Sequence, residues 1–242
     1  HHAIAVERGK IVAILPLADA RARYMAAKTV SLPEHVLIPG LVNLHCHAAM
    51  TLMRGLADDL PLMRWLQEAI WPTEARHASH AFVRDGSLLA GAEMLRGGIT
   101  TCNDMYFFPE ATAEAFDRLG LRAVLGITLL EFPSQYAADA DDYLRKGLAT
   151  HDAWRDHPLI RFTLAPHAPY TVSNTSFERI GALADELELP IHIHLHETAG
   201  EIADSLRDFG QRPITRLESL GILGPNLIGV HAVHLAPEDI ER

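Results

Sequence analysis

Cysteine is scarce in this sequence, where Cys46 and Cys102 are the only two copies. Neither belongs to a Cys-x-x-Cys pair, which argues against a disulfide framework and against a zinc site built from thiolates. A protein of the reducing cytoplasm fits this composition best.

Long apolar runs and basic segments are missing as well. No stretch approaches the roughly 18 consecutive apolar residues that a membrane span requires, and residues 1–30 lack the charged start and apolar stretch of an export signal. The 31 acidic against 21 basic residues give a formal net charge of -10, which would repel a phosphate backbone. We therefore expect a protein that binds neither membranes nor nucleic acid polymers.

Histidine, by contrast, is abundant. The sequence holds 15 histidines, several of them in tight clusters, and this points to metal or proton chemistry. Its 242 residues, 48% of them hydrophobic, are enough to bury a sizeable core. The first residues are His1-His2 rather than methionine, so we expect that the sequence is cut at its start.

Residues 1–38 are expected to form a small β unit, a portion of a β-sandwich. Short apolar stretches at 3–6, 10–15 and 36–38 predict strands, and glycine and proline residues separate them.

Residues 39–242 repeat a pattern of strand, helix and strand at intervals of roughly 30 residues, which is typical of βαβ units around a parallel sheet. We predict an α/β fold with six β/α units of a (β/α)8 TIM-type barrel, because each strand ends in the polar residues that such a barrel gathers at one rim. An open parallel sheet would leave backbone groups unpaired, so we expect the last two units to lie beyond Arg242. The six strands are expected near 41–47, 99–105, 121–130, 160–167, 190–196 and 226–233.

Two of the intervening helices carry sequence signals of their own. Phe82, Leu89 and Leu95 lie on an apolar stripe that ends at a pair of glycines, where a left-handed cap is favourable. Thr175-x-x-Glu178 has the form of a capping box before apolar residues at helical spacing.

The first histidine cluster is His45-Cys46-His47, at the end of the first expected barrel strand. Residues two apart on a strand point to the same face, so both imidazoles can reach one metal ion while Cys46 turns into the packing. Such a pair also occurs by coincidence or as surface histidines. Its position directly after an apolar strand favours the metal interpretation.

The second cluster lies in the segment IHIHLHE, where alternation puts His192, His194 and His196 on one face of a strand. Buried histidines are costly without partners, so either metal binding or a layer of hydrogen-bonded core histidines explains them. Periodicity leaves open which of the three binds metal. His196-Glu197 does not begin a His-Glu-x-x-His zinc helix, because Gly200 stands where the second histidine would be.

Two further strand ends carry histidine. His231 and His234 follow the last expected strand, and His167 follows the fourth. One such histidine is usually polar surface, but four of six strand ends bearing histidine favour a shared site at the rim.

These motifs together resemble those of the amidohydrolase superfamily. The segments are PGLVNLHCHAAMTLMRG, GGITTCNDMY, APHAPYT, IHIHLHET and GVHAVHL, and the resemblance runs from about residue 3 to the end of the chain. Within the superfamily, the sequence is most similar to deaminases acting on S-adenosylhomocysteine and 5'-methylthioadenosine. Guanine and cytosine deaminases and triazine hydrolases are relatives of that subgroup.

The resemblance implies a metal site made by His45, His47 and His194. It also implies that Glu197 is the proton shuttle and that His231 holds the metal-bound water. The superfamily's last ligand, an aspartate after the eighth strand, would fall beyond Arg242.

The resemblance places two further residues against the substrate. His167 and Glu74 match positions that contact substrate, and Glu74 would do so through ribose hydroxyls. Trp65, Trp71 and Tyr106 could stack on a purine, although core packing is the more frequent role of such residues.

The resemblance also bears on the number of metal ions. Binuclear members bridge two metals with a carboxylated lysine on the fourth strand, whereas the lysines here are Lys10, Lys28 and Lys146 only. We therefore expect one divalent ion, zinc or alternatively iron. Homodimers are frequent among relatives and are compatible with this sequence.

The function that follows is deamination of an adenosine-type purine by attack of metal-bound hydroxide. The alternatives are an aminohydrolase for guanine, cytosine or a triazine, and a non-catalytic relative that binds metal. Glu74 discriminates among the enzymes, because a free base offers it no ribose.

Overall fold

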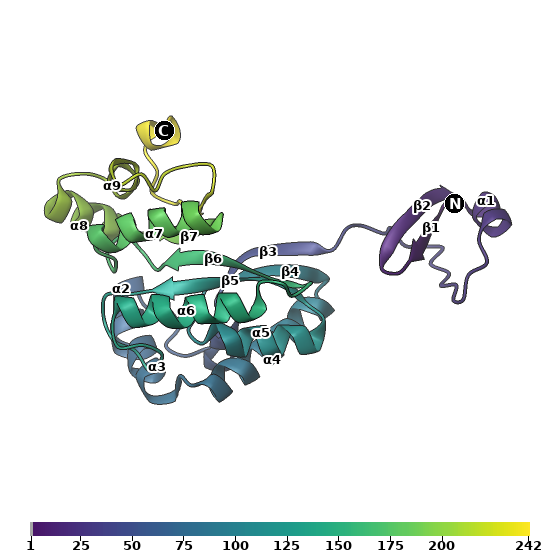
Figure 1. Cartoon of the computed structure of the whole chain (residues 1–242), viewed down its shortest axis with the longest axis horizontal. Coiled ribbons are helices and arrows are strands. Elements are labelled where there is room, and N and C mark those ends of the chain that lie inside the picture. Colours follow the sequence, from purple (N-terminus) through teal and green to yellow (C-terminus); the bar gives the residue numbers. More distant parts are fainter. Residues whose placement is uncertain (1) are drawn as a thin grey trace. The chain divides into compact units, whose positions relative to one another are not determined.

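The computed structural model describes residues 2–242. The chain divides into two compact units, His1–Pro39 and Gly40–Arg242 (Figure 1). Among the described residues, no helix has both the length and the apolar character needed to cross a membrane.

The first unit is built on a β-hairpin. Strands β1 (His2–Glu7) and β2 (Lys10–Pro16) pair antiparallel, and the turn residues Arg8 and Gly9 both have positive φ, which matches the right-handed twist of the strands. Helix α1 (Leu17–Arg23), which the sequence pattern did not predict, follows directly.

The third strand predicted at 36–38 is wrong. These residues lie outside any strand, and Val36 is 88% exposed. Prolines at 33 and 39 flank the segment, and proline cannot donate to a sheet ladder. That residues 1–38 belong to a β-sandwich stays a prediction.

The second unit is a parallel sheet of six strands in sequential order, β3 to β8. This order, with helices in every crossover, is that of the first six units of a TIM-type barrel and confirms the predicted fold class. The six predicted strands are confirmed to within two residues at each end. They are β3 (Leu41–Cys46), β4 (Ile99–Asp104), β5 (Arg122–Leu129), β6 (Ile160–Pro166), β7 (Ile191–Leu195) and β8 (Leu227–His231).

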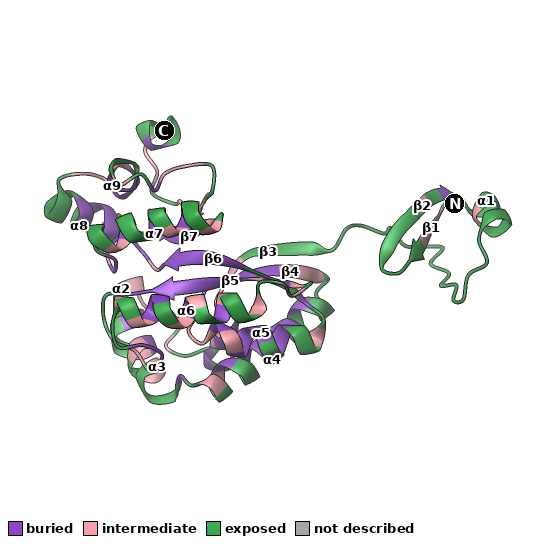
Figure 2. Cartoon of the chain, in the orientation of Figure 1, coloured by how far each residue is buried: buried purple, intermediate pink, exposed green. Residues whose placement is uncertain are grey.

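Helices connect the strands and bury the sheet. Figure 2 shows that β5 and β6 are buried along almost their whole length, whereas β3 is largely exposed. The helical segments are η1 (Ala48–Met53), α2 (Leu62–Trp65), η2 (Leu66–Ile70), α3 (Trp71–His77), α4 (His80–Arg96), α5 (Pro109–Leu119), α6 (Ala140–Trp154), α7 (Asn174–Leu187), α8 (Ala199–Phe209), α9 (Pro213–Ser219) and α10 (Pro237–Ile240).

The apolar stripe predicted for α4 is wrong by about one residue. Leu89 is 42% exposed, while its neighbour Ala90 is buried. The helix packs closely against η1, since a Cβ on Gly86 would lie 2.4 Å from the carbonyl oxygen of Ala49. Small residues therefore face the core here. The predicted left-handed glycine after the helix is Gly98, with φ +83.

The capping box predicted for α7 is also wrong. The N-cap is Ser173, whose hydroxyl accepts a hydrogen bond of 3.2 Å from the backbone N–H of Ser176. Thr175 lies inside the first turn, so the helix begins earlier than the pattern indicated.

Candidate active site

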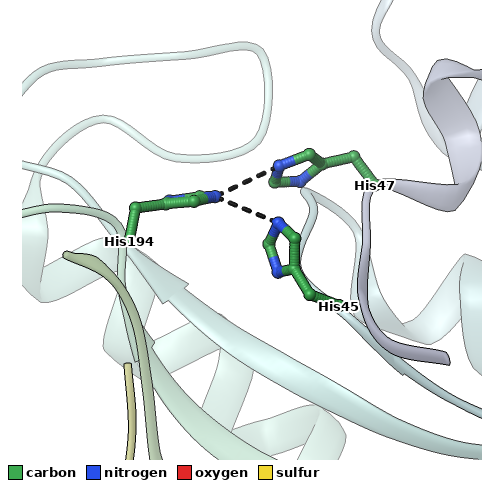
Figure 3. Close-up of side chains that lie close together, drawn as sticks. All are labelled: His45, His47 and His194. Carbon is green, nitrogen blue, oxygen red and sulfur yellow. Dashed lines mark hydrogen bonds between the residues drawn. The ribbon is translucent and has the colours of Figure 1, made fainter. Parts of the chain in front are cut away.

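Three histidines from distant parts of the chain meet at one rim of the sheet. His45 lies in β3, His47 follows that strand, and His194 lies in β7. Nε2 of His194 is 3.3 Å from Nε2 of His45 and 3.2 Å from Nε2 of His47, the contacts dashed in Figure 3. Each ring offers a nitrogen to one common point.

In two of the rings, the contact made by Nδ1 determines which nitrogen carries the proton and which has the free lone pair. Nδ1 of His47 lies 2.6 Å from the carbonyl oxygen of Met105, and Nδ1 of His194 lies 2.7 Å from that of His167. A carbonyl only accepts, so both Nδ1 atoms carry the proton. A neutral imidazole has one proton, so the Nε2 atoms of these two rings face each other as acceptors.

All three rings are neutral at pH 7. Burial, together with the neighbouring His47 and His192, lowers the pKa of His45 to about 3. Burial is also the main cause that lowers the pKa of His47 and of His194. Their lone pairs are therefore free for a ligand at neutral pH.

This donor set fits a divalent metal ion. Nitrogens at roughly 2.0–2.1 Å from a tetrahedral zinc ion are separated from one another by about 3.3 Å, close to the separations observed. Converging acceptors repel one another unless a cation lies between them. Cys46 contributes no ligand, because its side chain packs against the core and lies 3.6 Å from Oδ1 of Asp104.

His192 supports the cluster from one side. Its Nε2 is 3.0 Å from Nδ1 of His45, and the side chain is fully buried. Nδ1 of His192 has no hydrogen-bond partner among the described residues. The sequence placed His192 on the face of His194, but nothing in it indicated this contact with β3.

His196 departs from the predicted alternation. The strand ends at Leu195, and His196 has a left-handed backbone with φ +55. Its ring is hydrogen-bonded away from the cluster of His45, His47 and His194. Nε2 accepts from the backbone N–H of Ile214 at 3.1 Å, and Nδ1 lies 3.2 Å from the carbonyl oxygen of His234.

Glu197 and His231 form a second pair beside the cluster. Oε1 of Glu197 is 3.5 Å from Nε2 of His231, whose ring stacks on that of His194 with centroids 5.4 Å apart. Burial raises the pKa of Glu197, and the charge of His231 acts in the opposite direction. His231 and Ala232 both have positive φ, a conformation that concentrates at functional sites.

A cavity of about 480 Å³ opens beside the cluster of His45, His47 and His194. Its wall contains three of the residues singled out from the sequence, namely His47, Glu74 and His167. Burial lowers the pKa of His167 to about 3, so this imidazole is also neutral. The cavity therefore brings together a carboxyl group, neutral imidazoles and a largely apolar wall.

The aromatic residues considered from the sequence line the same cavity. Trp65 and Trp71 flank the π-helical turn η2, and Tyr106 follows β4. Such a turn is frequent at functional sites because it redirects neighbouring side chains. The hydroxyl of Tyr106 donates to Oε1 of Glu74 at 2.7 Å.

Three supporting residues escaped the sequence reasoning. Glu201 accepts two backbone hydrogen bonds, Arg216 braces the segment after β6, and Asp104 accepts a 2.6 Å bond from the N–H of Ala48. The pattern Thr198-x-x-Glu201 is a capping-box signature and could have revealed the first. No sequence signal pointed to the other two.

Comparison with known proteins identifies the family of this chain. The sequence model of the amidohydrolase family matches residues 36–242. The chain belongs to the amidohydrolase family.

Two 5-methylthioadenosine/S-adenosylhomocysteine deaminases are similar to this family member. The protein from Saccharophagus degradans is 47% identical over 240 residues, 99% of this chain and 54% of its own length. The protein from Teredinibacter turnerae is 48% identical over 235 residues, which are 97% of this chain and 53% of its own length.

Two solved structures show the same fold. An adenosine deaminase from Xanthomonas campestris with bound zinc is 52% identical, with a TM-score of 0.97 over 99% of this chain and 55% of that chain. Atrazine chlorohydrolase TrzN from Arthrobacter aurescens has a TM-score of 0.88 at 22% identity, over 99% of this chain and 58% of that chain, a likeness of fold alone. This amidohydrolase chain thus spans about half the length of the curated relatives it matches.

Proposed function

We propose that the protein containing this chain is a metal-dependent aminohydrolase that removes the amino group of an adenosine-type purine. The observation that carries the proposal is the cavity whose wall joins His47, Glu74 and His167 beside the histidine cluster. The relatives named as deaminases of 5'-methylthioadenosine and S-adenosylhomocysteine support this substrate class.

His45, His47 and His194 are the proposed ligands of one divalent ion. Zinc is the favoured ion, because imidazole nitrogens suit it and the Xanthomonas relative was solved with zinc bound. Once bound, the ion lowers the pKa of water in contact with it from about 15.7 towards about 7.

Glu197 is the proposed proton shuttle. As water adds to the ring carbon that bears the amino group, Glu197 takes a proton from the water and delivers it to the ring nitrogen. The same carboxylate then takes the proton of the added hydroxyl group, which becomes the ring carbonyl, and gives it to the amino group, so that the carbon–nitrogen bond breaks and ammonia leaves. A carboxyl group with a raised pKa is suited to this double task.

His231 and the cavity wall orient the reactants. His231 lies 3.5 Å from the Glu197 carboxylate and would hold the attacking water against it. Glu74 would accept hydrogen bonds from the ribose hydroxyls, and His167 would contact the purine. Both cysteines are free, which supports the expectation of a reducing, cytoplasmic setting.

The test is metal content together with ammonia release by the full-length protein. The substrates are S-adenosylhomocysteine, 5'-methylthioadenosine, adenosine, guanine and cytosine. About one metal ion per chain with turnover of the adenosine compounds would support the proposal. Turnover of a free base alone would favour the guanine or cytosine alternative. Bound metal without turnover would favour a non-catalytic relative. The absence of metal would overturn the mechanism.

A Glu74→Gln variant separates the enzyme alternatives. It should lose most of its activity on nucleosides, because the amide is a weaker acceptor for ribose hydroxyls than a carboxylate. Turnover of a free base should be spared.

A further inference from the structure

The chain turns sharply between β7 and α8. His196 adopts a left-handed backbone with φ +55, which is uncommon for a residue with a side chain. Glu197 follows at once, and Thr198 is the N-cap of α8. The backbone of the proposed proton shuttle is therefore set by a turn that needs support.

The carboxylate of Glu201 supplies that support. Oε1 accepts the backbone N–H of His196 at 2.9 Å, and Oε2 accepts the backbone N–H of Glu197 at 2.7 Å. The side chain is 5% exposed, so water does not replace these bonds. Each oxygen holds one residue of the turn.

Helix capping alone does not explain this geometry. In a capping box, the third residue of the helix reaches back to the N–H of the N-cap residue, which is Thr198 here. Glu201 instead reaches one and two residues farther back. Thr198 does its own part of the box, because its hydroxyl accepts from the N–H of Glu201 at 3.1 Å.

The other side of the turn is anchored independently. The ring of His196 accepts from the N–H of Ile214 at 3.1 Å and lies 3.2 Å from the carbonyl oxygen of His234. His196 is thus held through both its ring and its N–H, and the carboxylate of Glu197, the next residue, lies 3.5 Å from His231.

We propose that Glu201 is a positioning residue for Glu197: its two backbone hydrogen bonds set the distance between the Glu197 carboxylate and His231. The inference rests on the proposed function, in which Glu197 moves the proton. Glu201 belongs neither to the cavity wall nor to the cluster of His45, His47 and His194. Its effect is expected on the chemical step rather than on binding.

The experiment compares Glu201→Gln and Glu201→Ala with wild type in the full-length protein. A glutamine amide can accept one of the two bonds through its oxygen, while alanine accepts neither. We expect kcat to fall by on the order of tenfold in the first and a hundredfold in the second, as displacement of a catalytic group by about 1 Å does. KM and metal content should stay at wild-type values.

The matched control is Asp139→Ala. Asp139 is the N-cap carboxylate of α6 and accepts the backbone N–H of Asp142 at 2.9 Å. Its loss should lower the unfolding midpoint and leave kcat unchanged. If the Glu201 variants behave in the same way, Glu201 only caps its helix and the proposal is wrong.

A double-mutant cycle with Glu197→Gln makes the test specific. If Glu201 acts through Glu197, adding Glu201→Gln to Glu197→Gln should cause no further loss of kcat, because coupled residues are not additive. Additive losses would overturn the positioning role while leaving the proposed function intact. Full activity of Glu197→Gln would instead overturn both. The near-isosteric glutamine carries the cycle even if the alanine variant does not fold.

Discussion

The hydroxyl of Tyr106 donates a 2.7 Å hydrogen bond to Oε1 of Glu74, joining the end of β4 to helix α3 across the cavity wall. Burial raises the pKa of Glu74 to about 7, and the bond from Tyr106 acts in the opposite direction. The phenol thus both orients the carboxylate and stabilises its charged form.

Tyr106→Phe should raise KM for adenosine-type nucleosides by up to about fivefold, because a hydrogen bond of this kind contributes about 1 kcal/mol. Metal content should not change. The control is Tyr136→Phe, since the buried hydroxyl of Tyr136 has no hydrogen-bond partner among the described residues. Equal KM values for both variants would show that Tyr106 does not act on Glu74.

The same carboxyl group predicts a pH dependence of binding. With a pKa of about 7, Glu74 is ionised above that pH and becomes a weaker acceptor as it is protonated below it. KM for a nucleoside should therefore rise as the pH falls through about 7, measured from initial rates across about pH 6 to 8. In Tyr106→Phe the rise should begin at higher pH, because the bond that lowers the pKa is gone. A flat KM in both proteins would contradict this role for Glu74.

The spacing of apolar segments along the sequence predicted the strands, because each barrel strand is a continuous apolar run between turn signals. The same reasoning placed His45 and His47 at one rim with the group His192, His194 and His196, and the family resemblance singled out His194. It was wrong for 36–38, where an apolar run between prolines has no strand partner, and for α4, where close packing against η1 selects small residues over leucine.

Contacts between distant side chains were beyond the sequence. Alternation cannot say that His196 leaves the strand, because the left-handed turn depends on the Glu201 carboxylate four to five residues later. In the same way, Tyr106 and Glu74 lie 32 positions apart and meet only once the helices after β3 are packed.

His192→Phe should weaken metal binding by about tenfold to a hundredfold, as loss of a hydrogen-bond partner of a ligating histidine does. In the proposed site His45 presents Nε2 to the ion, so its Nδ1–H would donate to Nε2 of His192, which lies 3.0 Å away. Competition with a chelator measures the effect directly. The control is His80→Phe on α4, whose side chain is 43% exposed; affinities equal in the two variants would exclude a supporting role for His192.

We expect substitution of Arg216 to lower the stability of the fold and also to disturb the cavity wall. Its guanidinium is 1% exposed and donates to the carbonyl oxygens of Pro169 and Val172 at 2.5 and 3.0 Å, and to Oδ1 of Asn174 at 2.8 Å. These bonds hold the segment that follows His167 on the cavity wall. The planar group also stacks on Phe209, 3.8 Å from the ring centroid.

Arg216→Lys should lower the free energy of unfolding by on the order of 3 kcal/mol. An ammonium group cannot reproduce the planar array of guanidinium N–H donors and leaves buried carbonyl groups without partners. Denaturant unfolding of the full-length protein measures the change. The control Arg207→Lys affects exposed ion pairs with Asp204 and Asp208 and should leave the free energy of unfolding at its wild-type value. If Arg216 also holds the wall through the segment after β6, KM should rise in the first variant and not in the second. A stability loss without that rise would limit Arg216 to packing.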